Sequence, residues 1–182
     1  MSIKSTFLIF LLSLGLNGFS QVHIDTHRIG PFTVGKSLED INEEAGTNIS
    51  FSAEDNVKFD FSRKVVITGV EYRLVFQDYY NMNGTFMGKR LYSVSVSNDI
   101  FKTAEEIGVG STREEIIAAY GNSDICIYSN WDETTGKRIP QKTSISVDYV
   151  DGNNPGGYLF ELENNKVIEV MINASYQDET KG

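Results

Sequence analysis

The feature that most constrains the fold of this chain is a short segment that occurs twice, 75 residues apart. Residues 34–46 (VGKSLEDINEEAG) and 109–121 (VGSTREEIIAAYG) align without a gap. They are identical at five of thirteen positions, which are Val34/Val109, Gly35/Gly110, Glu39/Glu114, Ile41/Ile116 and Gly46/Gly121. Self-similarity at a constant spacing indicates that one supersecondary unit occurs twice. We therefore expect a tandem-repeat protein.

Each copy has the start and stop signals of a helix of about two turns. Ser37 and Thr112 are expected N-caps, because a hydroxyl at that position accepts a hydrogen bond from a free N–H group of the first turn. An acidic residue follows three positions later in both copies and completes a capping box. Gly46 and Gly121 fall where a helix commonly ends in a left-handed residue.

Downstream of each helix, the hydrophobic pattern changes to the alternation typical of β-strands. We expect strands at residues 65–76, 91–96, 125–128, 145–150, 158–162 and 167–172. The segments 91–96 and 167–172 also align, at an offset of 76 residues. The pattern predicts an α+β fold of two tandem repeats, each a helix-loop-helix packed on a small antiparallel sheet. Repeat 1 would span residues 29–100 and repeat 2 residues 101–176.

This tandem unit resembles the fold of the beta-lactamase inhibitory protein family. Residues 107–121 (IGVGSTREEIIAAYG) are similar to the helix signature of that family, and they also resemble the small lipoprotein of the outer-membrane barrel-assembly machinery. The resemblance implies a binding protein without catalytic residues that docks on a partner through its sheet face and hairpin loops. The inhibitor has disulfides and the lipoprotein a lipidated cysteine, and this sequence provides for neither, so only the fold is carried over.

The first twenty residues are typical of a signal peptide. Lys4 is basic, and residues 7–16 (FLIFLLSLGL) form an apolar run of ten, which is too short to cross a bilayer as a stable helix. An N-terminal membrane anchor or a buried helix is the alternative interpretation. No cysteine lies at the expected cleavage site before Gln21, so we expect no lipid anchor. The mature protein would be exported, periplasmic or secreted, with flexible ends at residues 21–28 and 177–182.

The charge and the cysteine content restrict the partners. The chain has 16 basic and 25 acidic residues, a net charge of −9. Such a surface repels nucleic acid and anionic lipid, so we expect neither as a partner. Cys126 is the only cysteine, which excludes an internal disulfide. It lies in an apolar alternating stretch, and we expect a buried small hydrophobe rather than a nucleophile.

The strongest candidates for partner binding surround an expected hairpin turn. Tyr79, Tyr80, Met82 and Phe86 place large apolar groups where a turn would ordinarily be polar. Aromatic side chains on a loop are good anchors, because they bury much area at a low entropy cost. The alternative is that some of them fold back onto the sheet. Trp131, the only tryptophan, is a second candidate, although a place in the core also fits its position at the end of a strand.

A weak candidate for a calcium site lies near a glycine-rich turn and consists of Asp148, Asp151 and Asn153, followed by Asn154. The spacing is not that of an EF-hand, and a hairpin turn explains the same residues. No motif of a known catalytic type is present in the sequence, and we expect no cofactor.

The sequence thus favours an exported, non-catalytic binding module that recognises a protein through its sheet face and hairpin loops. A small-ligand or calcium-binding protein with a site between the repeats, with or without enzymatic activity, is the alternative.

Overall fold

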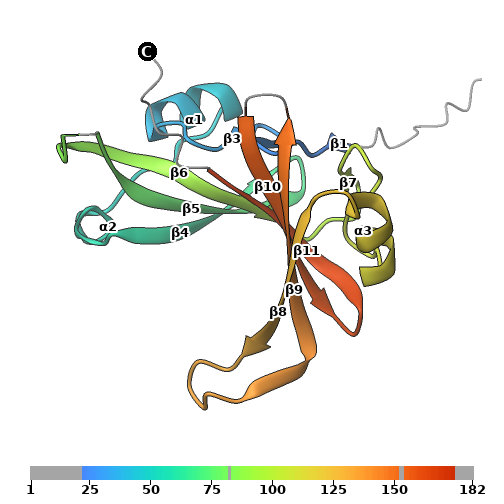
Figure 1. Cartoon of the computed structure of the whole chain (residues 1–182). Helices are drawn as coiled ribbons and strands as arrows, with labels where there is room; N and C mark the ends of the chain where they lie inside the picture. The colour runs from blue at the N-terminus through green and yellow to red at the C-terminus, as the bar shows by residue number, and fades with distance from the viewer. Residues whose placement is uncertain (1–21, 82, 152–153, 175–182) are drawn as a thin grey trace, which may run out of the picture.

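The computed structural model describes residues 22–81, 83–151 and 154–174 (Figure 1). Its main feature is one antiparallel sheet of seven strands, which Figure 1 shows as strongly twisted. In sheet order the strands are β4 (Asp60–Ile67), β5 (Val70–Tyr80), β6 (Phe86–Val96), β11 (Lys166–Asn173), β10 (Asn154–Glu163), β9 (Arg138–Asp151) and β8 (Asp124–Trp131). The first half of the chain thus provides three neighbouring strands of the sheet, and the second half provides the other four.

The remaining elements are short. Two-stranded pairings join β1 (Val22–His23) to β7 (Phe101–Lys102) and β2 (Arg28–Ile29) to β3 (Phe32–Thr33). The helices of the described residues are α1 (Leu38–Ala45), α2 (Ala53–Val57) and α3 (Arg113–Tyr120). None of the helices in these residues has the length and apolar character needed to cross a membrane.

The predicted fold class is wrong. The structure is mainly β, with 53% strand and 14% helix, and it has one large sheet in place of two helix-loop-helix units on small sheets. The reason is the pairing of β6 with β11, the last strand of each half, in which Val94 lies opposite Ile172 and Val96 opposite Val170. These four side chains are at most 1% exposed. Because the two halves share this buried seam, their strands form one sheet and one core.

The two aligned segments are attached to the sheet in the same way. The Gly35 N–H donates to the Leu91 carbonyl oxygen (2.7 Å), and the Gly110 N–H donates to the Val167 carbonyl oxygen (2.9 Å). The N–H groups of Leu91 and Val167 in turn donate to the residue that follows each glycine. Both glycines have a positive φ, 83° and 89°, a conformation that side chains disfavour. The sequence identity at these positions therefore has a backbone cause.

The predicted helix signals are mostly confirmed. Ser37 and Thr112 are N-caps, and both capping boxes are present. Gly46 ends α1 in the left-handed conformation (φ 62°), as expected. The prediction for Gly121 is wrong, because its φ is −59° and its conformation is right-handed. There the chain turns directly into β8, and the Ser123 N–H donates to the Tyr120 carbonyl oxygen (2.8 Å).

The predicted strand at residues 65–76 is two strands. Thr68 (φ 49°) and Gly69 (φ 82°) form a two-residue turn, and Ile67 pairs with Val70 on either side of it. Positive φ at both turn positions is typical of the tightest hairpins. The buried face takes odd-numbered positions in β4 and even-numbered positions in β5, so the alternation shifts by one residue at the turn, and this shift is the sequence signal that separates the two strands.

The core lies on one face of the sheet. Along β5, the side chains of Tyr72, Leu74 and Phe76 are buried, whereas those of Glu71 and Arg73 are exposed. The helices and the N-terminal segment cover the buried side; they contribute core residues Ile24, Ile29, Phe32, Ile41, Ile116 and Tyr120. We call the other side, which carries Arg73, Glu161 and Glu169, the open face.

The N-terminal segment is part of this core. Residues 21–28 were expected to be flexible, but Val22 and His23 form β1, and the Ile24 N–H donates to the Lys102 carbonyl oxygen (2.8 Å). Ile24 and Thr26 are 1% and 5% exposed. The alternation of apolar Val22 and Ile24 with polar neighbours is a strand pattern that is too short to be recognised from sequence.

Truncating Ile24 tests this arrangement. Ile24→Ala should lower the free energy of unfolding by about 2–4 kcal/mol, because it removes a completely buried side chain and leaves a cavity. Urea denaturation measures the change. Val57→Ala is the control, since Val57 is 83% exposed and its truncation should leave the stability nearly unchanged. Equal stability of both variants would show that the segment does not pack as described.

Candidate partner-binding surfaces

An exposed apolar surface lies at one end of the sheet. It consists of residues that are 49–83% exposed and that come from α2, the connection between α2 and β4, and the β5–β6 hairpin: Val57, Phe59, Tyr80, Phe86 and Met87. Tyr80 pairs with Phe86 across the hairpin, with ring centroids 5.6 Å apart. The Asp78 N–H donates to the Phe59 carbonyl oxygen (3.0 Å), which places Phe59 beside the same hairpin. We call these five residues the apolar tip.

A buried lysine lies behind the apolar tip. The Lys89 side chain is 2% exposed; its ammonium donates to Asp78 Oδ1 and to the carbonyl oxygen of Lys58, and it lies 5.8 Å from the centre of the Phe61 ring. A buried charge is costly unless it is paired and hydrogen-bonded. The two acceptors satisfy Lys89 and tie the residue that follows α2 to the hairpin.

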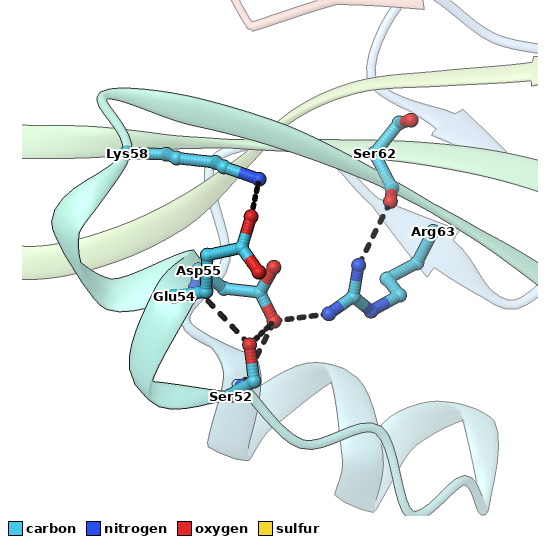
Figure 2. A network of polar contacts seen from close by, with 6 residues as sticks. All are labelled: Ser52, Glu54, Asp55, Lys58, Ser62 and Arg63. Carbon is cyan, nitrogen blue, oxygen red and sulfur yellow. Dashed lines mark hydrogen bonds and ion pairs between the residues drawn. The ribbon is translucent and has the colours of Figure 1, made fainter.

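A second polar network holds α2 itself (Figure 2). The Asp55 side chain is buried, with 5% of its residue surface exposed. Its carboxylate accepts hydrogen bonds from the hydroxyl and the backbone N–H of Ser52, and it forms an ion pair with Arg63 of β4. The hydrogen bond from the Ser52 side chain, followed by the bond from the Ser52 backbone and the charge of Arg63, lowers the pKa of Asp55 below its ordinary value of 3.8. Glu54 forms an ion pair with Lys58 one turn later (2.6 Å). These contacts fix the position of Val57 and Phe59 relative to the sheet.

The predicted hairpin residues have different outcomes. Tyr80 and Phe86 are exposed and lie together, as the binding hypothesis requires. Tyr79 is half-buried, with the guanidinium of Arg90 3.5 Å from the centre of its ring. Met82 lies outside the described residues. The sequence analysis missed Val57 and Phe59, because their position relative to the hairpin depends on strand pairing and the Lys89 contacts. It also missed Met87, which directly follows Phe86 in β6.

Trp131 is not in the core. Its side chain is 61% exposed, which contradicts the alternative of a buried tryptophan. It ends β8 at the opposite edge of the sheet from β4, so the structure does not bring it together with the apolar tip. Figure 1 shows the β5–β6 and β8–β9 hairpins extending in different directions.

Cys126 is also exposed, so its expected burial is wrong. It lies in β8, the last strand of the sheet, opposite Ser146 of β9 on the open face. A hydrogen bond with Cys126 raises the pKa of the neighbouring phenol of Tyr128. Alternation predicted a strand here correctly, but burial depends on whether something covers that strand.

A polar groove of about 330 Å³ lies on the open face where the two halves meet; it is lined by Lys64, Glu71, Arg73, Ser95, Ser97, Asn98 and Glu169. The Ser95 hydroxyl donates to Glu169, and Arg73 approaches the same carboxylate at 3.9 Å. Lys64 and Glu71 form an exposed ion pair (2.7 Å). The groove thus offers both charges and several hydroxyl and amide groups, typical of a surface that binds polar groups.

Next to the groove, two carboxylates lie directly opposite each other in adjacent strands, Glu169 of β11 and Glu161 of β10. Like charges in this relation repel. Each carboxylate has its own donors: Glu161 accepts from Asn130 (2.9 Å) and from Ser144 (2.8 Å), whereas Glu169 accepts from Ser95. The open face therefore has a hydrogen-bonded polar row that extends from β5 to β8.

Of the weak calcium candidate, only Asp148 has a side chain that the structure describes. Asp148 is exposed and lies opposite Asp124. The side chain of Asp151 and the whole of Asn153 lie outside the described residues. In the part of the chain that the structure describes, no group of three His, Cys, Asp or Glu side chains is arranged to hold a metal ion.

Comparison with known proteins adds no relative. No family model matches the chain, and neither the curated proteins nor the solved structures contain a match. The functional assignment therefore depends on the surfaces described above.

The Asp55 network predicts how stability depends on pH. Because folding lowers the pKa of Asp55, its contribution is present above the unfolded pKa near 3.8 and is lost as the pH falls below it. The thermal midpoint should decrease below pH 4, and Asp55→Asn should reduce the decrease because residue 55 no longer titrates. Thermal melts between about pH 3 and pH 6 measure this. The same substitution at exposed Asp99, outside the network, should leave the wild-type pH profile.

Proposed function

We propose that this protein is an exported, non-catalytic binding module that recognises another protein through the apolar tip and the adjoining open face. The observation that carries the proposal is the apolar tip itself. Five large apolar side chains stay exposed at this end of the sheet, although the same chain buries eight aromatic residues in its core. Contiguous apolar surface of this kind on a soluble domain marks an interaction site.

The tip has the composition of an interface centre. Tyr80 and Phe86 are aromatic anchors on a hairpin, and Met87 is an adaptable contact beside them. The buried Lys89–Asp78 ion pair links the two strands of the hairpin, so that they are held in place before a partner binds. Preorganisation of this kind lowers the entropy lost on association.

Charge indicates the chemistry of the partner. Residues 58–90 contain six basic and three acidic residues, a net charge of +3, in a chain whose total is −9. The basic residues include Lys64 and Arg73 on the open face and Arg90 behind the hairpin. A partner with an apolar pocket and an acidic rim would complement this half of the sheet and would be excluded from the acidic remainder.

Replacing the anchors tests the proposal. Tyr80→Ser/Phe86→Ser should reduce capture of the partner from an envelope extract of the source organism at least about tenfold, because the two rings supply the centre of the contact. Capture by wild type should weaken at high salt, as charge complementarity requires. The control is Ile117→Ser/Ile168→Ser, which alters two exposed residues away from the tip. Equal yields of the same proteins with both double variants would exclude the tip as the binding surface.

The polar groove favours a second candidate, a small polar ligand bound between the two halves of the chain. Arg73 and Lys64 would bind a carboxylate, and Glu169 and Glu71 would bind an ammonium group. A small zwitterion, which has both groups, is therefore the matching class of ligand. Thermal melts with free amino acids at about 10 mM should raise the midpoint if the groove binds them. Arg73→Ala should abolish the shift. The absence of any shift with wild type would remove this candidate and leave the protein-binding proposal unaffected.

A further inference from the structure

The sheet has two edges, β4 and β8, and they differ in how they are protected from pairing with another chain. An edge strand presents unpaired N–H and C=O groups, so natural proteins cover it or place charges on it. Arg63 and Lys64 lie in the middle of β4, and Arg63 is ion-paired with Asp55 of α2 (Figure 2). Charge and a neighbouring helix therefore protect β4.

The other edge, β8, lacks the charges that protect β4 over seven of its eight residues. Residues 125–131 (ICIYSNW) contain no charged residue, no proline and no glycine. Three of these residues are large, apolar and exposed: Ile127, Tyr128 and Trp131 are 42%, 52% and 61% exposed. An uncharged segment of about seven residues with high β propensity readily adds a further strand.

Ile127 indicates what the edge lacks. It lies opposite the completely buried Ile145 of β9, on the face of the sheet that packs into the core. Ile127 stays half-exposed because β8 is the last strand and, among residues 22–81, 83–151 and 154–174, no strand lies beyond it. A strand added there would bury Ile127 between two neighbours and extend the core face.

We propose that β8 pairs antiparallel with β8 of a second copy of this chain, so that the two sheets join into one across a two-fold axis. Identical antiparallel strands are self-complementary, and the contact closes after two copies. Charge favours this edge as the place where two copies meet. The chain has a net charge of −9, so copies repel over most of their surface, whereas Asp124 is the only charged residue of β8. Antiparallel pairing places the two Asp124 carboxylates at opposite ends of the contact.

Sedimentation of the purified protein between roughly 1 and 200 µM tests the contact, which should be weak because one strand edge buries less than about 1,200 Å². A monomer–dimer equilibrium is expected. Ile127→Lys should weaken the dimer at least about tenfold by placing a cation on the edge. Ser129→Lys repeats the test without removing an apolar group, in case Ile127→Lys does not fold. The matched control is Val66→Lys on β4, which is 66% exposed and should dimerise like wild type.

Cys126 provides a position-specific readout, because it is the only cysteine and is exposed. Nitroxide labels on two paired β8 strands should lie within about 25 Å of each other, given a rise of about 3.3 Å per residue and a strand spacing of about 4.8 Å. A monomer over the whole concentration range would overturn the proposal. So would a dimer that neither lysine on β8 weakens, or labels that lie beyond about 40 Å in the dimer.

Discussion

The pairing of β6 with β11 is the contact on which the rest of the structure depends. Each half of the chain ends its series of long strands with one of these two, and Val94, Val96, Val170 and Ile172 bury the seam between them. Without this pairing each half would expose an apolar strand edge and only part of a core. With it, both halves share one sheet, and α1 and α3 pack on the same core face through Ile41 and Ile116.

The shared sheet decides which surfaces remain available. Because the helices and the N-terminal segment cover the core face, the open face has the polar row from Arg73 to Asn130. The groove lies where the two halves meet, with Ser95 from one and Glu169 from the other. The apolar tip lies at the end of the sheet next to α2, where the buried Lys89 links the residue that follows α2 to Asp78 of the hairpin.

The two edge strands of the sheet differ in charge. The β4 edge combines central charges with an ion pair to α2, and the chain around it is basic. The β8 edge is uncharged over residues 125–131 and exposes three large side chains. In the two proposals made above, this asymmetry separates two roles within one sheet. The β4 side presents a charged and apolar surface suited to a different protein, and the β8 side presents a backbone edge suited to a second copy.

The sequence by itself determined the local structure: both capping boxes, the left-handed end of α1 and the approximate positions of the strands, apart from the hairpin at Thr68 and Gly69. These features depend on hydrogen bonds and side-chain patterns within a few residues, which a sequence displays directly. Only the tertiary structure decided that the halves share one sheet, that Cys126 and Trp131 are exposed, and that Phe59 lies beside the 78–86 hairpin. Each of these depends on which strand neighbours which, and pairing between strands far apart in the chain leaves no local signature in the residues that it brings together.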